Sequence, residues 1–143
     1  ISKNNKNKLD EYAHNFGGIK AIVNSVSNIY DDLIIVYGCG GERDSSEREK
    51  IMKFVCTNSR KVIFTSDNSR NESFQSILDD SRKDQEYSNL IVESDRKRAI
   101  KSGLEVIKED EILLILGKGH EEFQEINGTK IPFNDQRVVE KML

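Results

Sequence analysis

The sequence has few of the residues that would place it among disulfide-linked or membrane-spanning proteins. Only two cysteines occur among its 143 residues. They are too few for a disulfide framework, so a reduced, cytosolic setting is the simplest interpretation. No apolar run approaches the length of a transmembrane helix, and no signal peptide opens the chain. We therefore expect a cytoplasmic protein without a membrane partner.

An excess of positive charge is also lacking. The 22 Lys and Arg residues face 25 Asp and Glu residues, for a net charge of -3. This balance argues against a nucleic-acid partner held through phosphate contacts. Hydrophobic residues make up 36% of the chain and charged residues 33%, which is typical of one globular domain with a well-solvated surface.

Several motifs of catalysis are missing as well. Lys118 is followed by Gly119 instead of Ser or Thr, and Ile112 stands where a P-loop requires glycine, so we expect no ATP-binding loop. The His and Cys residues lack the spacing of a metal site, and no nucleophile elbow is present. The run Gly38–Gly41 has no third glycine at the fingerprint position, which favours a tight turn over a dinucleotide site.

The sequence does contain segments with the apolar spacing of helices, which alternate with short apolar runs typical of buried strands. Helices are predicted over residues 15–29, 45–57, 72–86, 95–108 and 135–143, and strands over 33–37, 61–65, 90–92 and 111–116. The pair Asn127-Gly128 predicts a hairpin of strands 123–126 and 129–131. The alternation indicates an α/β fold with a mostly parallel sheet covered on both faces, to which the hairpin adds an antiparallel edge.

Two helix starts and the beginning of the chain carry more specific expectations. Ser45 or Ser46 is predicted to cap the second helix, and Asp95 the fourth, with residues 95–98 forming a solvated helix start. Residues 1–8 are polar and basic and lack an initiator Met. We therefore expect residues 1–10 to be a linker or a truncated end, and residues 11–143 to be one domain of a longer protein.

Polar loops follow three of the predicted strands, at Gly38–Arg43, Ser66–Arg70 and Gly117–Glu121. The carboxyl ends of parallel strands share one edge of a sheet, where ligands bind. Two arginines there offer cations, and a glutamate with glycine carbonyls offers an anionic site. This combination suits a zwitterion such as an amino acid.

Each of these loops also has a purely structural interpretation. From spacing alone, Arg43 is more often a surface arginine paired with a neighbouring acid. Residues 67–69 are of the types that cap their own turn. His120 is more often a structural group than a catalyst at such a position.

Four motifs taken in order resemble a known family. Tyr12-Ala13-His14, Gly38–Asp44, Thr65–Arg70 and Gly117–Glu121 look like the C-terminal domain of the Mur ligases. The resemblance extends from Tyr12 to Leu143. It is closest to the ligases that add the third residue of the peptidoglycan stem peptide to UDP-N-acetylmuramoyl-L-alanyl-D-glutamate.

The resemblance implies a Rossmann-like three-layer domain that follows UDP-binding and ATPase domains of the same protein. ATP and Mg²⁺ are then expected mainly in the central domain, where an acyl phosphate forms on the D-Glu carboxylate. This domain presents the amino acid whose amine attacks that group. It carries no catalytic residue, and we expect it to be inactive alone.

The resemblance also implies residue roles. It assigns the binding of meso-diaminopimelate to Arg43, Asp67, Asn68, Ser69, Arg70, Gly117 and Glu121. It places Tyr12 and His14 near the bound nucleotide. Lysine-adding relatives lack the arginine that matches Arg70, because lysine has no distal carboxylate. Arg70 therefore favours diaminopimelate over lysine or ornithine.

The chain departs from the family pattern at several places, which include Glu11 for the usual Asp and Asn15-Phe16 for the usual Thr-Pro. Ser69 stands for the motif proline, Ser45–Glu49 replaces a lysine-rich segment, and Gln136 replaces the arginine of the last motif. Alternatives therefore stay open: a lysine- or ornithine-adding relative, a folate-polyglutamate or cyanophycin-type ligase, or a non-catalytic module that binds a zwitterion.

Overall fold

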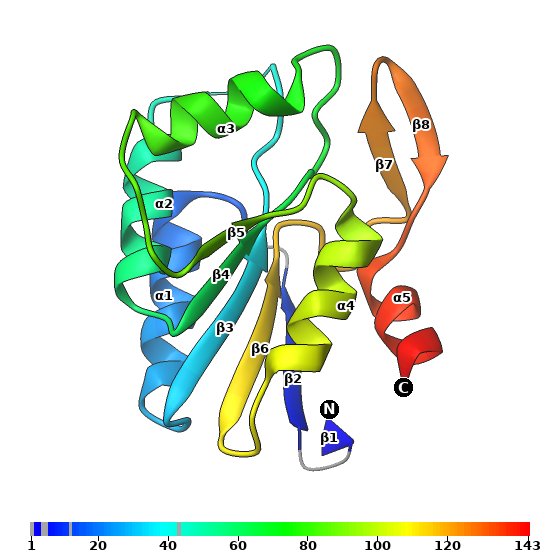
Figure 1. Cartoon of the computed structure of the whole chain (residues 1–143). Coiled ribbons are helices and arrows are strands. Elements are labelled where there is room, and N and C mark those ends of the chain that lie inside the picture. The colour runs from blue at the N-terminus through cyan, green and yellow to red at the C-terminus, as the bar shows by residue number, and fades with distance from the viewer. Residues whose placement is uncertain (1, 4–5, 12, 43) are drawn as a thin grey trace.

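A six-stranded sheet forms the centre of the molecule, in the order β1-β2-β6-β3-β4-β5 (Figure 1). The computed structural model describes residues 2–3, 6–11, 13–42 and 44–143, and for those before residue 12 it describes the backbone. The strands are β1 (Ser2–Lys3), β2 (Lys6–Glu11), β3 (Asp32–Tyr37), β4 (Lys61–Phe64), β5 (Leu90–Val92) and β6 (Glu111–Leu116). The strands β2 to β6 pair in parallel with one another, and β1 pairs antiparallel with β2.

Helices cover both faces of this sheet. On one face lie α1 (Phe16–Ser27), α2 (Arg48–Thr57) and α3 (Phe74–Arg82), and on the other lie α4 (Arg96–Val106) and α5 (Asp135–Met142) (Figure 1). Side chains of a strand point alternately to the two faces. Leu33, Ile35 and Tyr37 of β3 therefore pack under the first group of helices, while Ile34 and Val36 pack under the second.

The chain reverses direction across the sheet between β3 and β6. From β3 it moves outward through β4 to β5, and then returns through α4 to place β6 between β2 and β3. The loop after β3 leads to α2 on one face, and the loop after β6 leads to the opposite face. Such a switch point opens a crevice at the carboxyl edge of a parallel sheet.

The predicted helices and strands are all present, but α2 begins later than the sequence predicts. Its N-cap position is Glu47, not Ser45 or Ser46. The carboxylate of Glu47 accepts a hydrogen bond from the backbone N–H of Phe16 at 2.8 Å, and Ser46 N donates to Asp44 Oδ1 at 2.9 Å. The segment before α2 therefore turns to bind the start of α1 instead of continuing the helix.

The hairpin forms as predicted but does not extend the main sheet. β7 (Phe123–Ile126) and β8 (Thr129–Pro132) make a separate two-stranded sheet, and positive φ at Asn127 and Gly128 agrees with the predicted turn. An isolated bridge between Arg70 and Ile126 joins it to the loop after β4. The hairpin therefore lies beside the candidate site.

The start of the chain differs from the expected linker. Residues 6–11 form β2, which pairs in parallel with β6 from Asn7↔Ile112 to Glu11↔Leu116. The boundary expected at residue 10 thus falls inside a strand. A polar strand such as β2, which lies between β1 and β6, has no apolar pattern of its own, and its parallel partner lies far along the sequence.

The start of α4 is not the solvated cluster that the sequence predicts. Asp95 caps the helix as expected, accepting a hydrogen bond from Arg98 N at 3.1 Å. Arg96, however, is 1% exposed and forms a bidentate ion pair with Asp135 of α5, at 2.7 and 2.6 Å.

Within the described residues, no helix is long and apolar enough to cross a membrane.

Candidate functional site

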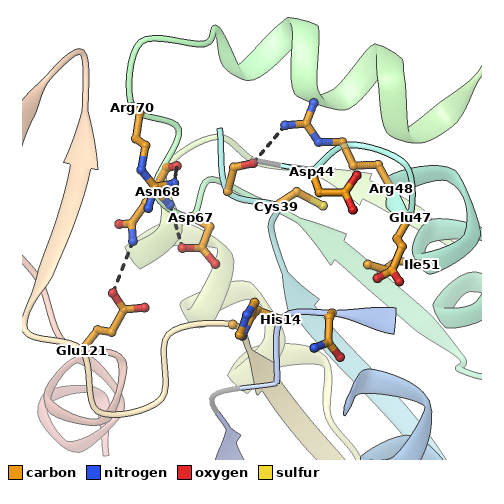
Figure 2. Close-up of a pocket in the computed structure, with 13 residues that line it drawn as sticks. His14, Cys39, Asp44, Glu47, Arg48, Ile51, Asp67, Asn68, Arg70 and Glu121 are labelled. Carbon is orange, nitrogen blue, oxygen red and sulfur yellow. Dashed lines mark hydrogen bonds between the residues drawn. The ribbon is translucent and has the colours of Figure 1, made fainter. Parts of the chain in front are cut away.

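A pocket of about 480 Å³ opens at the carboxyl edge of the sheet. The loops after β3, β4 and β6 meet here with the start of α1, as the sequence analysis predicted for the three strand ends. Figure 2 shows Arg70, Asn68 and Glu121 on one side of it and Arg48 and Glu47 on the other. Its lining is His14, Asn15, Cys39, Gly40, Asp44, Glu47, Arg48, Ile51, Asp67, Asn68, Arg70, Gly117 and Glu121.

Asn68 joins the loops that form this pocket. Its side-chain Oδ1 accepts hydrogen bonds from Lys118 Nζ and from the backbone N–H of Glu125, both at 2.9 Å. Its Nδ2 donates to Glu121 Oε2 at 3.3 Å, and its carbonyl accepts from Gly41 N at 2.7 Å. Through its side-chain amide and its backbone carbonyl, Asn68 thus links the loops after β3, β4 and β6 to the hairpin.

The guanidinium of Arg70 lies against backbone carbonyls at the rim of the pocket. Nη1 donates to Gly41 O at 2.9 Å and to Asn68 O at 3.1 Å, and Nε lies 3.7 Å from Glu125 Oε2. In the described part of the chain, Nη2 has no hydrogen-bond partner. Arg70 is therefore held in place while part of its fork stays available to a carboxylate.

Two glycines let the loops approach closely. A Cβ at Gly41 would lie 1.9 Å from Ser69 O, and one at Gly117 would lie 2.5 Å from Asp67 Oδ2. Gly117 also has φ of +114°, a region that favours glycine. The close packing brings the backbone of the β6 loop to the pocket and leaves Asp67 and Ser69 only 6% and 5% exposed. Ser69 thus shapes the loop and does not line the pocket.

An ion pair between Arg48 and Glu72 supports the wall of the pocket opposite Arg70 (Figure 2). Arg48 is 4% exposed, and its guanidinium binds Glu72 at 2.8 and 3.0 Å and Gly40 O at 2.9 Å. These hydrogen bonds from Arg48 lower the pKa of Glu72 to about 2. This pair is not predictable from the sequence, because two charges 24 residues apart carry no local signal of contact.

The remaining reactive side chain of the pocket is Cys39. It is half-buried, and burial raises the pKa of its thiol to about 12. A thiol rather than a thiolate is therefore present at neutral pH, which removes the nucleophilic form. Among the described residues, no group of three or more His, Cys, Asp or Glu side chains could hold a metal ion.

Most of the predicted site residues lie around this pocket. Asp67, Asn68, Arg70, Gly117 and Glu121 line the pocket together with His14. Tyr12 and Arg43 lie outside the described residues.

The buried position of Lys118 is not predictable from the sequence pattern. Its side chain is 0% exposed, and its Nζ donates a hydrogen bond to Asn68 Oδ1 at 2.9 Å. The only available signal was its place between two glycines at the end of a buried strand.

Comparisons with known proteins place the chain in a family. Residues 1–119 match the family model described as "Mur ligase, glutamate ligase domain". The UDP-N-acetylmuramoyl-L-alanyl-D-glutamate–2,6-diaminopimelate ligase of Aquifex aeolicus is 38% identical over 139 residues, covering 93% of this chain and 28% of the relative. The ligase of the same name from Helicobacter hepaticus is 42% identical over 132 residues, covering 90% and 28%.

A solved structure of a ligase with this name superposes with a TM-score of 0.92 at 31% sequence identity, covering 99% of this chain and 30% of that one. The chain thus spans less than a third of the length of these relatives. The match to the family model covers most of the chain, and the fold agrees with the solved structure. The chain therefore belongs to the Mur ligase family, in which it corresponds to the glutamate ligase domain.

Proposed function

We propose that this chain is the amino-acid-presenting domain of an ATP-dependent ligase that joins meso-diaminopimelate to UDP-N-acetylmuramoyl-L-alanyl-D-glutamate. One observation carries the proposal: Arg70 and Glu121 line the same pocket, and Asn68 lies between them. A cation and an anion on either side of an amide donor match the distal end of diaminopimelate, which carries a carboxylate and an ammonium.

In this proposal Arg70 binds the distal carboxylate and Glu121 the distal ammonium. The Gly117 carbonyl is a further acceptor for the ammonium, since the positive φ of this glycine turns its backbone. Arg43 is proposed as a second cation for the carboxylate, and Tyr12 and His14 as residues near the nucleotide. Binding both charges of the distal end leaves the other amino group directed out of the domain toward its acceptor.

The chemistry belongs to the full-length protein. ATP and Mg²⁺ are proposed to bind mainly in a central domain, and UDP-N-acetylmuramoyl-dipeptide to be held jointly with a UDP-binding domain, in the cytoplasm. The acyl phosphate that ATP provides makes the D-Glu carboxyl group reactive toward an amine. The residues of this chain contribute by holding the attacking amine in position, which replaces a bimolecular encounter by a local one.

The test is Arg70→Ala in the full-length protein that carries this chain. We expect KM for diaminopimelate to rise at least ~30-fold, because truncating one partner of a partly buried charge pair costs about 2 kcal/mol or more. Arg137→Ala is the matched control, since this arginine is 69% exposed and lies outside the pocket lining. Unchanged turnover of diaminopimelate by Arg70→Ala would refute the assignment.

The same assay separates the alternatives. The wild-type protein should use diaminopimelate in preference to lysine or ornithine, and residues 1–143 alone should form no product. A preference for lysine would assign the chain to a lysine-adding ligase. Binding of diaminopimelate by the full-length protein without any ATP-dependent ligation would assign it to a non-catalytic binding module.

A further inference from the structure

We infer that Lys118 is a positioning residue of the pocket: its buried ammonium fixes the side-chain amide of Asn68 so that the amide nitrogen faces Glu121 and the ligand. The inference rests on the proposed function for its ligand, and on the structure alone for the orientation of the amide. Lys118 itself does not line the pocket, so it acts through Asn68.

Lys118 has no access to water. Its side chain is 0% exposed, and Nζ lies 2.9 Å from Asn68 Oδ1 and 3.8 Å from Asp67 Oδ1. A buried ammonium is costly unless protein acceptors replace water around it. Burial lowers the pKa of Lys118, and the charges of Asp67 and Glu121 oppose that shift. Asp67 and Glu121 line the pocket, and a third acid that favours the charged lysine, Asp135, lies on α5.

The hydrogen bonds of Asn68 permit one orientation of its amide. A carbonyl oxygen has two acceptor positions, and Lys118 Nζ and Glu125 N both donate to Oδ1 at 2.9 Å. A flipped amide would turn its NH₂ group against these two donors. The nitrogen therefore points the other way, where one N–H reaches Glu121 Oε2 at 3.3 Å. The second N–H has no partner among the described residues and is available to a ligand.

Replacing Lys118 by Met removes the ammonium and keeps a long, unbranched side chain in the same space. Asn68 Oδ1 would then retain only the backbone N–H of Glu125, and Asp67 would lose its nearest cation. The amide could rotate, and Glu121 would lose a donor of fixed direction. Weaker binding of the amino acid should follow.

A purely structural lysine would give a different result. Its loss would lower stability without acting specifically through Asn68, and the effects of changing Lys118 and Asn68 would combine independently. A double-mutant cycle measures this difference, because residues that act through one another are not additive.

The kinetic experiment compares Lys118→Met, Asn68→Ala and the double variant in the full-length protein. We expect each single variant to raise KM for diaminopimelate about tenfold or more, and the double variant to differ from Asn68→Ala by less than about twofold. KM for ATP should stay within about twofold. Lys130→Met is the control, since this lysine is exposed on β8. Multiplied effects in the double variant, or unchanged KM in Lys118→Met, would overturn the inference.

A second measurement does not depend on the ligand. With ¹⁵N-labelled asparagine, Asn68→Ala identifies the side-chain amide signals of Asn68 in the full-length protein. We expect two well-separated proton signals in the wild type and averaged or broadened signals in Lys118→Met. Should that variant fail to fold, Lys118→Gln, which keeps a donor, takes its place and should preserve the separated signals. Sharp, unchanged signals in Lys118→Met would overturn the inference even if the proposed substrate is wrong.

Discussion

The buried pair of Arg96 and Asp135 provides the most quantitative test of how this domain is held together. Arg96 is 1% exposed and Asp135 0% exposed, and two hydrogen bonds of 2.7 and 2.6 Å join them. Arg96 also donates to Ser66 O and Leu116 O, each at 3.2 Å. Ser66 begins one loop of the pocket and Leu116 immediately precedes another, so the pair ties α5 to the base of the site.

We expect Arg96→Met to destabilise the chain by about 3–5 kcal/mol, since it leaves a buried carboxylate without its partner. For a domain of this size the shift in Tm is about 3 °C per kcal/mol, so Tm should fall by roughly 10–15 °C. The double variant Arg96→Met/Asp135→Leu removes both charges. It should lose less than the sum of its single changes, with a coupling energy of at least about 2 kcal/mol.

Urea denaturation followed by circular dichroism measures these values, because the chain has no Trp for fluorescence. The m-value should stay constant across the variants. Additivity of the two single changes within about 0.5 kcal/mol would refute the reasoning. A loss below about 1 kcal/mol for Arg96→Met would show that the pair contributes no more than an exposed ion pair does.

Two further predictions concern stability. Gly41→Ala should destabilise the chain by more than about 1 kcal/mol, because its Cβ would meet Ser69 O at 1.9 Å. Gly17→Ala in α1 should stabilise the chain by about 0.5–1 kcal/mol, because its Cβ would meet nothing closer than 3.7 Å. Equal effects of the two substitutions in urea denaturation would contradict this prediction. The pKa of Glu72 falls from 4.5 to about 2 through Arg48, so its stabilisation is complete above pH 4.5 and is lost as the pH falls toward 2. Stability measured from pH 7 to 2.5 should therefore fall less steeply in Glu72→Gln, and identical slopes would refute this role.

Much of the fold follows from local patterns. The strands β3 and β6 are continuous runs of apolar residues, because helices cover both of their faces. Asp95 caps the helix that follows it, and Asn127 and Gly128 form the turn in which they lie, so both features depend only on nearby residues. The polar strand β2 and the late start of α2 were not predicted, because both depend on contacts with distant parts of the chain. β2 is a strand because β6 lies beside it, and α2 starts late because Glu47 binds the start of α1.

The candidate site also has residues that were predictable from the sequence and residues that were not. The residue types and the positions of Asn68, Arg70, Gly117 and Glu121 after strands indicated a site at one sheet edge, and the structure places all four around one pocket. The supporting residues were not predictable. Arg48 was taken as part of a departure from the family pattern, and it holds the opposite wall.

The sequence by itself determined the order of helices and strands, the parallel sheet and the edge at which the polar loops gather, because these depend on periodicity and on connections between neighbours in the chain. Only the tertiary structure decided which charges are buried and what they bind. The partners of Lys118 and Arg96 lie 50 and 39 residues away along the chain, and the energy of a buried charge depends on groups that folding brings together.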